Sequence, residues 1–248
     1  MKISVVTVCF NAAAVFAPTI ESVLEQDHPE KEHIVLDGAS TDGTQDVVAR
    51  YAGEGVRLVS EPDRGMYDAL NKGLRLFAGE AFGALNADDA YHDRTALSRI
   101  AEALATADIA HGDLDFVENH EDKRVVRRWR ARERPRGGFR TGWMPAHPTF
   151  YVRRRVAETV GDFDLSLKTA ADYDWMLRAV ELHGFSVATV PGVLVDMMQG
   201  GKSTASLSSY VRHNLESLSA RRRWLNAGLV DAALLAKPAR KIGQFMAR

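Results

Sequence analysis

Residues 3–11 read ISVVTVCFN, and this stretch decides the fold class. The β-branched run from Ile3 to Cys9 predicts a strand that is buried on both faces, at the centre of a parallel sheet. Residues 18–24 place their apolar side chains on one helical face, and residues 33–36 resume strand character. The chain therefore begins with one β-α-β unit.

The same alternation continues downstream. Helical and strand-like patterns follow each other over residues 42–51 (helix), 56–59 (strand), 66–77 (helix), 82–85 (strand) and 95–105 (helix). This order predicts an α/β fold with a mostly parallel central sheet flanked by helices. With 248 residues, 46% of them hydrophobic, the chain is long enough for one domain with a substantial core.

Cysteine usage and hydropathy predict a cytoplasmic protein. Cys9 is the single cysteine and lies in an apolar run, so the chain forms no internal disulfide and its thiol is expected to be buried. The N-terminus enters a strand-like pattern without the basic and apolar regions of a secretion signal. No stretch stays apolar for the ~18 residues that a membrane-spanning helix needs.

The net charge of −1 hides an uneven distribution. Residues 121–140 carry nine Lys and Arg against three Asp and Glu, and residues 202–248 carry nine against two, so the remainder is negative. Within the last segment, residues 210–245 combine apolar positions at helical spacing with Arg and Lys, which predicts a basic helical C-terminal tail. Such a helix suits an anionic membrane surface, but packing on the domain or on a second copy in a homodimer explains the pattern equally well. Nucleic acid is not an expected partner, because neither segment carries an aromatic platform or a recognition helix.

Polar residues follow each of the first four predicted strands. They are Asn11 after the first strand, residues 37–44 after the second, residues 61–65 after the third and residues 86–89 after the fourth. In open α/β sheets, ligands bind beyond the carboxyl ends of the strands. The four polar segments therefore predict a ligand site at this edge of the sheet.

Residues 67–73 read YDALNKG. With the polar segments, this motif resembles the family 2 glycosyltransferases of the GT-A fold, particularly bacterial polysaccharide enzymes, over roughly residues 1–195. The resemblance implies a single GT-A-type domain over residues 1–200. Its expected parts are a nucleotide-sugar-binding half (1–110), an acceptor half (111–200) and a helical basic extension (201–248).

The activity implied by the resemblance is transfer of a sugar, with inversion, from a nucleotide diphosphate sugar. The implied acceptor is a glycan or lipid-linked glycan in cell-surface polysaccharide synthesis. A lipid-linked acceptor would explain a protein that is peripheral at the inner face of the cytoplasmic membrane. The expected donor is a UDP-sugar first and a GDP-sugar second.

The resemblance also implies a divalent cation, Mn²⁺ or Mg²⁺, with Asp88 and Asp89 as its ligands. A hard cation held by carboxylates and bridging phosphate oxygens neutralises the charge of a leaving diphosphate. Asn86 stands where the family usually has an aspartate, which leaves fewer negative charges around the metal. The alternative is that Asp88 and Asp89 form a turn or cap the next helix.

For the donor nucleotide, the resemblance implies that Asp37 accepts an N–H from the base. Gly38 stands where many relatives have a second acid, and the following residues 40–42 also suit a turn and helix cap. Arg64 is expected near the phosphates, with a surface salt bridge as its alternative. The complete set of expected donor contacts is Val8, Phe10, Asn11, Asp37, Arg64, Asn71, Lys72, Asn86, Ala87, Asp88 and His147.

Inverting transfer needs a base that takes the proton of the acceptor hydroxyl, and the resemblance assigns this role to Asp172. Ala171 stands where the family has a glutamate. Asp174 is the alternative base, but on a helix it would point away from Asp172, which favours helix capping or an ion pair with Arg178. His147 is expected to meet the acceptor or the diphosphate, or simply to be a hydrogen-bonded residue.

Two functions from other classes remain as alternatives. A nucleotidyltransferase would share the sheet and the metal carboxylates, but it should carry a Gly-rich basic loop after the first strand, where this chain has Asn11 and three alanines. A sugar-nucleotide-binding module without catalysis is consistent with Asn86 and Ala171. The presence of Asp88, Asp89 and Asp172 favours an enzyme, and an assay of donor hydrolysis or transfer separates the two.

Overall fold

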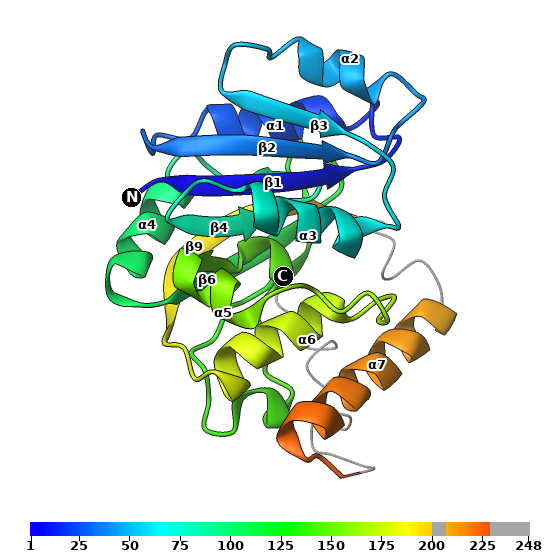
Figure 1. The fold of residues 1–248 in the computed structure, drawn as a ribbon. Coiled ribbons are helices and arrows are strands. Elements are labelled where there is room, and N and C mark those ends of the chain that lie inside the picture. The colour runs from blue at the N-terminus through cyan, green and yellow to red at the C-terminus, as the bar shows by residue number, and fades with distance from the viewer. Residues whose placement is uncertain (200–206, 229–248) are drawn as a thin grey trace.

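The computed structural model describes residues 1–199 and 207–228 (Figure 1). Its elements in chain order are β1 (Ile3–Cys9), α1 (Phe16–Leu24), β2 (Lys31–Asp37), α2 (Thr44–Ala49), β3 (Val56–Ser60), α3 (Met66–Leu76), β4 (Ala81–Ala84), β5 (Asp89–Tyr91), α4 (Ala96–Thr106), β6 (Ile109–Val117), β7 (Val125–Trp129), η1 (Gly138–Thr141), η2 (His147–Thr149), β8 (Tyr151–Arg153), α5 (Arg154–Val160), α6 (Ala171–Leu177), η3 (Arg178–Leu182), β9 (Val187–Met198) and α7 (Leu207–Leu225).

The elements predicted up to residue 106 are all present, with ends within two residues of the prediction. The largest change is in α2, which begins at Thr44 instead of residue 42 because Gly43 has a left-handed backbone conformation, with φ of 91°. Cys9 is buried, as its apolar surroundings predict.

The described strands form one sheet in the order β3-β2-β1-β4-β8-β6-β9-β5, with β7 paired to β6. β1 pairs in parallel with β2 and β4, β2 pairs in parallel with β3, and β6 with β9. Because β8 is antiparallel to both β4 and β6, the strands β6 and β9 run in the same direction as β1. The prediction of a mostly parallel sheet is confirmed, with β5, β7 and β8 running the opposite way.

Alternate residues of the central strands enter two different cores. Ile34 of β2 packs with Leu70 and other residues of α3 on one face, whereas Val35 packs with Phe16 of α1 and Val47 of α2 on the other. Helices thus cover both faces of the first half of the sheet, which is why β1 is buried along almost its whole length (Figure 1).

Gly73 in the YDALNKG segment allows α3 to approach the sheet closely. A Cβ atom at this position would lie 2.7 Å from Val6 Cγ1 and 3.2 Å from Leu36 Cδ1. The glycine therefore fixes how α3 lies across β1 and β2, and with it the position of the residues at the start of α3.

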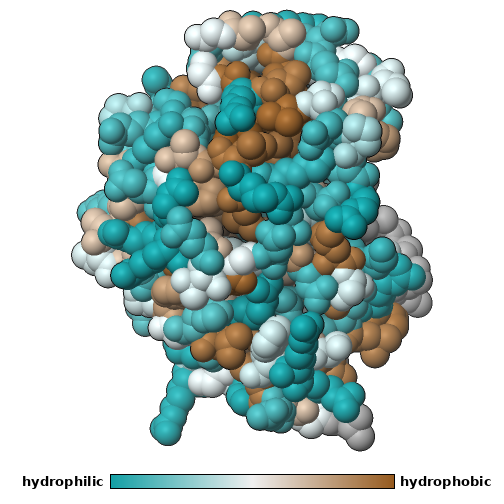
Figure 2. All heavy atoms as spheres, in the orientation of Figure 1, coloured by the Kyte–Doolittle hydropathy of each residue, from teal (hydrophilic) through white to brown (hydrophobic). Residues whose placement is uncertain are grey.

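The surface is mostly hydrophilic on the face drawn in Figure 2. Apolar atoms gather in the upper part of this view, where β2 and β3 lie in Figure 1. Within residues 1–199 and 207–228, none of the helices has the length and apolar character required to cross a bilayer.

Candidate functional site

The loops after β1 and β2 are joined by hydrogen bonds at the carboxyl edge of the sheet. The Asn11 main-chain N–H donates to Ser40 Oγ at 2.7 Å, and Asn11 Oδ1 accepts from the Thr41 N–H at 3.0 Å. Val8 is partly buried at the end of β1, and Phe10 is 56% exposed. The first two predicted polar segments therefore meet, with an exposed aromatic ring beside them.

The structure gives Asp37 a different role from the predicted contact with a base. Its side chain is 2% exposed, and Oδ2 accepts hydrogen bonds from Gln45 Nε2 at 2.7 Å and Ser60 Oγ at 2.6 Å. The Ser40 N–H and hydroxyl also donate to this carboxylate. These protein donors occupy the Asp37 oxygens, so in this structure Asp37 holds the loop after β2 together.

Three donor residues predicted around α3 are held by protein partners. Asn71 is 2% exposed, and its amide pairs with the main chain of Phe163, donating to the carbonyl at 3.0 Å and accepting from the N–H at 2.7 Å. Lys72 Nζ lies 2.9 Å from Glu61 Oε1 and from the Pro62 carbonyl oxygen. Arg64 forms an exposed ion pair with Asp68 at 2.9 Å, the alternative stated for it above.

For Asn71, both polar atoms of the buried amide are paired inside the fold, so in this structure the side chain holds the Phe163 main chain. Lys72 holds the loop after β3 through its contacts with Glu61 and Pro62. The Arg64 guanidinium stays at the surface, where exchange of Asp68 for a phosphate costs little.

The two aspartates after β4 lie in different surroundings. Asp89 is fully buried, where Oδ2 accepts from Asn86 Nδ2 at 2.6 Å and Oδ1 accepts from the Met198 N–H at 3.3 Å. Burial, with the charge of Asp88 as a smaller cause, raises the pKa of Asp89 well above its ordinary value. Asp89 therefore links the loop after β4 to β9, and in this structure both of its oxygens are paired inside the protein.

Asp88 is the carboxylate of this segment that remains partly exposed. Its main chain is fixed by His120, whose Nε2 lies 2.9 Å from the Asp88 carbonyl oxygen. Among the described residues, no group of three His, Cys, Asp or Glu side chains is arranged to hold a metal ion. One carboxylate fits a cation such as Mg²⁺, which proteins often hold through one or two carboxylates and the phosphates of a substrate.

Asp172 lies in the first turn of α6 and accepts a hydrogen bond from the Tyr67 hydroxyl at 3.1 Å. Burial and the nearby charge of Asp172 raise the pKa of Tyr67, so the phenol stays protonated and acts as the donor. The Tyr67 ring stacks on Phe163, with centroids 6.0 Å apart, and Asn71 holds the Phe163 main chain. Because α3 begins beyond the carboxyl end of β3, this contact brings Asp172 to the edge where the polar loops meet.

His147 lies in the same neighbourhood. Its ring meets the Phe163 ring edge-on, with centroids 6.2 Å apart. Burial lowers the pKa of His147, and the charge of Asp172 partly opposes this effect, which places the two side chains within electrostatic reach. A neutral imidazole near Asp172 can donate or accept a hydrogen bond.

Asp174, the alternative base, is a structural residue. Its Oδ2 lies 2.8 Å from Arg178 Nε, and its Oδ1 accepts from Trp224 Nε1 at 2.7 Å. The predicted ion pair with Arg178 is confirmed. Trp175 is buried in the core, as its helical apolar pattern predicts.

The described part of the tail, α7, packs against the segment that carries Asp172. Glu216 accepts hydrogen bonds from the main-chain N–H groups of Lys168, Thr169 and Ala170, immediately before α6. Arg221 donates to the Tyr173 hydroxyl at 2.8 Å. Packing on the domain thus explains one side of the helix, while Lys237, Arg240 and the rest of the predicted tail after residue 228 lie outside the described residues.

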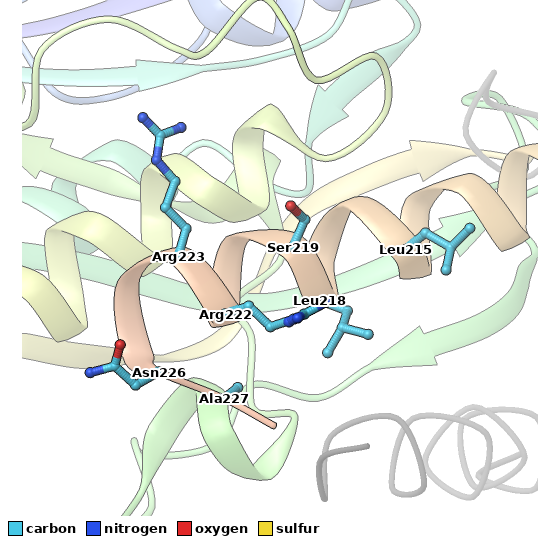
Figure 3. Close-up of a pocket in the computed structure, with 7 residues that line it drawn as sticks. All are labelled: Leu215, Leu218, Ser219, Arg222, Arg223, Asn226 and Ala227. Atoms are coloured by element: carbon cyan, nitrogen blue, oxygen red, sulfur yellow. The ribbon is translucent and has the colours of Figure 1, made fainter. Parts of the chain in front are cut away.

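A surface hollow of about 700 Å³ lies on α7 and is shown in Figure 3. Leu218 and Arg222 lie together on one side of the helix, and Arg223 points to the other. The hollow is lined by Leu215, Leu218, Ser219, Arg222, Arg223, Asn226 and Ala227. None of them is a predicted site residue.

Comparison with known proteins identifies the family. Residues 4–161 match the model of glycosyl transferase family 2. The chain belongs to this family. An uncharacterized glycosyltransferase of Mycobacterium tuberculosis is 31% identical over 190 residues, covering 71% of this chain and 68% of the relative. A PGL/p-HBAD biosynthesis glycosyltransferase of the same species is 29% identical over 182 residues, with the same coverage.

Solved structures support the GT-A fold. The mannosyltransferase PcManGT from Pyrobaculum calidifontis, in complex with GDP-Man and Mn²⁺, has a TM-score of 0.66 and 21% identity, covering 94% of this chain and 66% of that one. S. aureus TarS 1-349 in complex with UDP-GlcNAc has a TM-score of 0.68 and 17% identity, covering 90% of this chain and 73% of that one. The chain thus spans slightly less than two thirds of the mannosyltransferase.

Several residues of this site escaped the prediction. Tyr67 is the first residue of the YDALNKG segment, and its place beside a polar loop was the available signal. His120 and Glu216 are single polar residues in long stretches, without a local pattern that distinguishes them. Only the fold brings them to Asp88 and to the start of α6.

Proposed function

We propose that this chain is an inverting, metal-dependent glycosyltransferase that uses a nucleotide diphosphate sugar and a glycan or lipid-linked glycan acceptor in cell-surface polysaccharide synthesis. The observation that carries the proposal is the contact between Asp172 and Tyr67. It joins a carboxylate of the second half of the chain to the edge where the loops after the parallel strands converge. Family membership favours transfer over nucleotidyl transfer.

In the proposed reaction, the acceptor hydroxyl oxygen forms a bond to the anomeric carbon while the bond from that carbon to the phosphate oxygen breaks. The hydroxyl proton passes to Asp172, and the bonding electron pair leaves with the nucleoside diphosphate. Tyr67 holds the Asp172 carboxylate in place by its hydrogen bond, and His147 lies close enough to orient an acceptor hydroxyl. Approach opposite the leaving group accounts for inversion.

Asp88 is the residue proposed to hold the cation. A bound Mn²⁺ or Mg²⁺ would supply positive charge against the leaving diphosphate. His120 fixes the main chain of Asp88, so that the carboxylate needs little reordering to bind. The neighbour that contains GDP-Man and Mn²⁺ supports this donor and metal class.

A peripheral membrane location is proposed from the outer side of α7. Val211 and Leu215 are exposed on this helix, beside the exposed Arg212 and Arg222. Apolar and basic side chains together suit an anionic surface. Sedimentation with anionic vesicles at low salt supports this location if added salt reverses binding, and a failure to bind counts against it.

Donor binding is the first test of the proposed function. We expect UDP-sugars or GDP-sugars to raise the melting temperature of the protein, and Mn²⁺ to increase the shift, because a ligand of the folded state stabilises it by mass action. Transfer to an acceptor then separates the enzyme from a binding module without catalysis. The absence of any shift across the donor panel would contradict the proposal.

A further inference from the structure

The space above Gly38 is filled by the side chain of Asp63. A Cβ atom at position 38 would lie 2.7 Å from Asp63 Oδ2 and 3.4 Å from Phe10 Cδ2. Any side chain at position 38 would therefore displace the Asp63 carboxylate. The glycine that follows Asp37 thus admits a carboxylate from another loop to this point of the sheet edge.

Three strand ends converge around this carboxylate. The Gly38 N–H donates to the Cys9 carbonyl at 2.9 Å, and the Glu61 N–H donates to the Asp37 carbonyl at 3.0 Å. The charge of Asp63 is one of the causes that raise the pKa of the Cys9 thiol to about 12, after burial and Asp37. Asp63 therefore lies at the ends of β1 and β2, although it follows β3 in the sequence.

The loop that carries Asp63 is held on both sides. Asp63 Oδ1 accepts from the Gly65 N–H at 2.7 Å, and Lys72 Nζ holds the Pro62 carbonyl at 2.9 Å. Among the described residues, Asp63 Oδ2 has no hydrogen-bond partner. One oxygen thus fixes the side chain, and the other is left facing Gly38 and the exposed Phe10 ring.

We propose that Asp63 recognises the base of the donor nucleotide by accepting a hydrogen bond from it, with the base stacked against Phe10. The inference rests on the proposed function, since it names the group that would recognise the donor at the same site. Asp37 cannot take this role, because protein donors occupy both of its oxygens. An exposed aromatic ring next to an open carboxylate provides both a stacking surface and a hydrogen-bond acceptor.

The single open oxygen selects among the bases. Uracil offers one ring N–H between two carbonyl groups, which suits one carboxylate oxygen. Guanine presents two adjacent N–H donors that call for both oxygens, and cytosine presents an unprotonated ring nitrogen that a carboxylate repels. The site is therefore expected to bind uridine nucleotides more tightly than guanosine nucleotides, and cytidine nucleotides most weakly.

The test compares the binding of UDP, GDP and CDP to the full chain by calorimetry, in the presence of Mn²⁺. In Asp63→Asn the amide keeps the shape of the side chain, and its carbonyl can still accept from Gly65. We expect UDP affinity to fall about 10-fold or more, since a hydrogen bond to a charged group is lost. The ratio of UDP affinity to CDP affinity should fall by more than the UDP affinity itself, because an amide can donate a hydrogen bond to the ring nitrogen of cytosine and so strengthens CDP binding. Asp122→Asn, which changes an exposed acid between β6 and β7, is the matched control.

Gly38→Ala provides a second variant, which removes no polar group from the chain. Its Cβ displaces the end of a flexible side chain, so we expect the fold to survive and UDP affinity to fall. UDP binding that Asp63→Asn leaves intact, or an unchanged UDP-to-CDP ratio, would overturn the assignment of Asp63. Tighter binding of GDP than of UDP by the wild-type protein would overturn the predicted base preference. Binding of none of the three nucleotides by the wild type would instead overturn the proposed function.

Discussion

Replacing Glu216 by alanine removes the acceptor that α7 provides to the segment before α6. Glu216 Oε1 accepts from the Lys168 N–H, and Oε2 accepts from the Thr169 and Ala170 N–H groups and from the Thr169 hydroxyl. The Lys168 group is exposed, so water replaces its partner at little cost. The three partly buried donors lose about 1 kcal/mol each, or about 3 kcal/mol in total. For a chain of this size, such a loss lowers the melting temperature by about 6–12 °C.

The same change should lower activity, because Asp172 follows this segment within two residues. A carboxylate displaced by ~1 Å can cost up to about 100-fold in rate. The assay measures the melting temperature and the release of nucleoside diphosphate from a UDP-sugar in Glu216→Ala. Glu102→Ala, which changes an exposed residue of α4, is the control and should stay within about 0.5 kcal/mol of wild type. If Glu216→Ala melts and turns over like this control, α7 does not position the base.

Three further predictions address the cation, the base and the buried histidines. Asp88→Asn should abolish the Mn²⁺-dependent gain in donor affinity, whereas Asp89→Asn should retain it, because Asp89 is buried away from solvent; calorimetry with and without Mn²⁺ decides, and equal losses would contradict the distinction. Tyr67→Phe keeps the stacking on Phe163 but removes the hydroxyl, so we expect kcat to fall about 10-fold with donor affinity unchanged; an unaltered kcat would show that Tyr67 does not hold the base. Burial lowers the pKa of His33 to about 3 and that of His111 to about 4, so the unfolded chain binds protons that the folded chain does not as pH falls below 6.5. Unfolding free energy should therefore drop by about 2 kcal/mol per histidine between pH 7 and 5, and urea unfolding of His33→Gln should show a smaller drop; the same drop in both proteins would refute this.

The first half of the fold could be predicted because its signals are local. Parallel strands buried on both faces leave continuous apolar runs, as in β1, and each helix between them shows its own period. The second half lacks this regularity. β5 and β8 have three residues each, and their antiparallel partners lie far away in the sequence, so no local pattern marks them.

The residues of the candidate site also fall into two groups, those that local sequence motifs indicate and those that only the fold reveals. Short motifs single out Asp88 and Asp172 as candidates, and the structure leaves Asp88 partly exposed and places Asp172 beside Tyr67. The burial of Asp37 was not predictable, because its hydrogen-bond donors Gln45 and Ser60 come from two other segments that only the fold brings together. Tyr67 and Asp172 lie 105 positions apart, and no sequence pattern connects them. Residue type therefore indicated the chemistry, while the fold decided which carboxylates are open to a ligand.

The most direct test of the central claim is sugar transfer by wild type and Asp172→Asn. The measurement is release of nucleoside diphosphate from a UDP-sugar or GDP-sugar in the presence of Mn²⁺ and a membrane glycan extract, with donor affinity determined in parallel. We predict acceptor-dependent release by wild type and a decrease of roughly 100-fold in Asp172→Asn with donor affinity preserved, because an amide cannot take the hydroxyl proton. Release by Asp172→Asn at a rate close to that of wild type would contradict the assignment of the base.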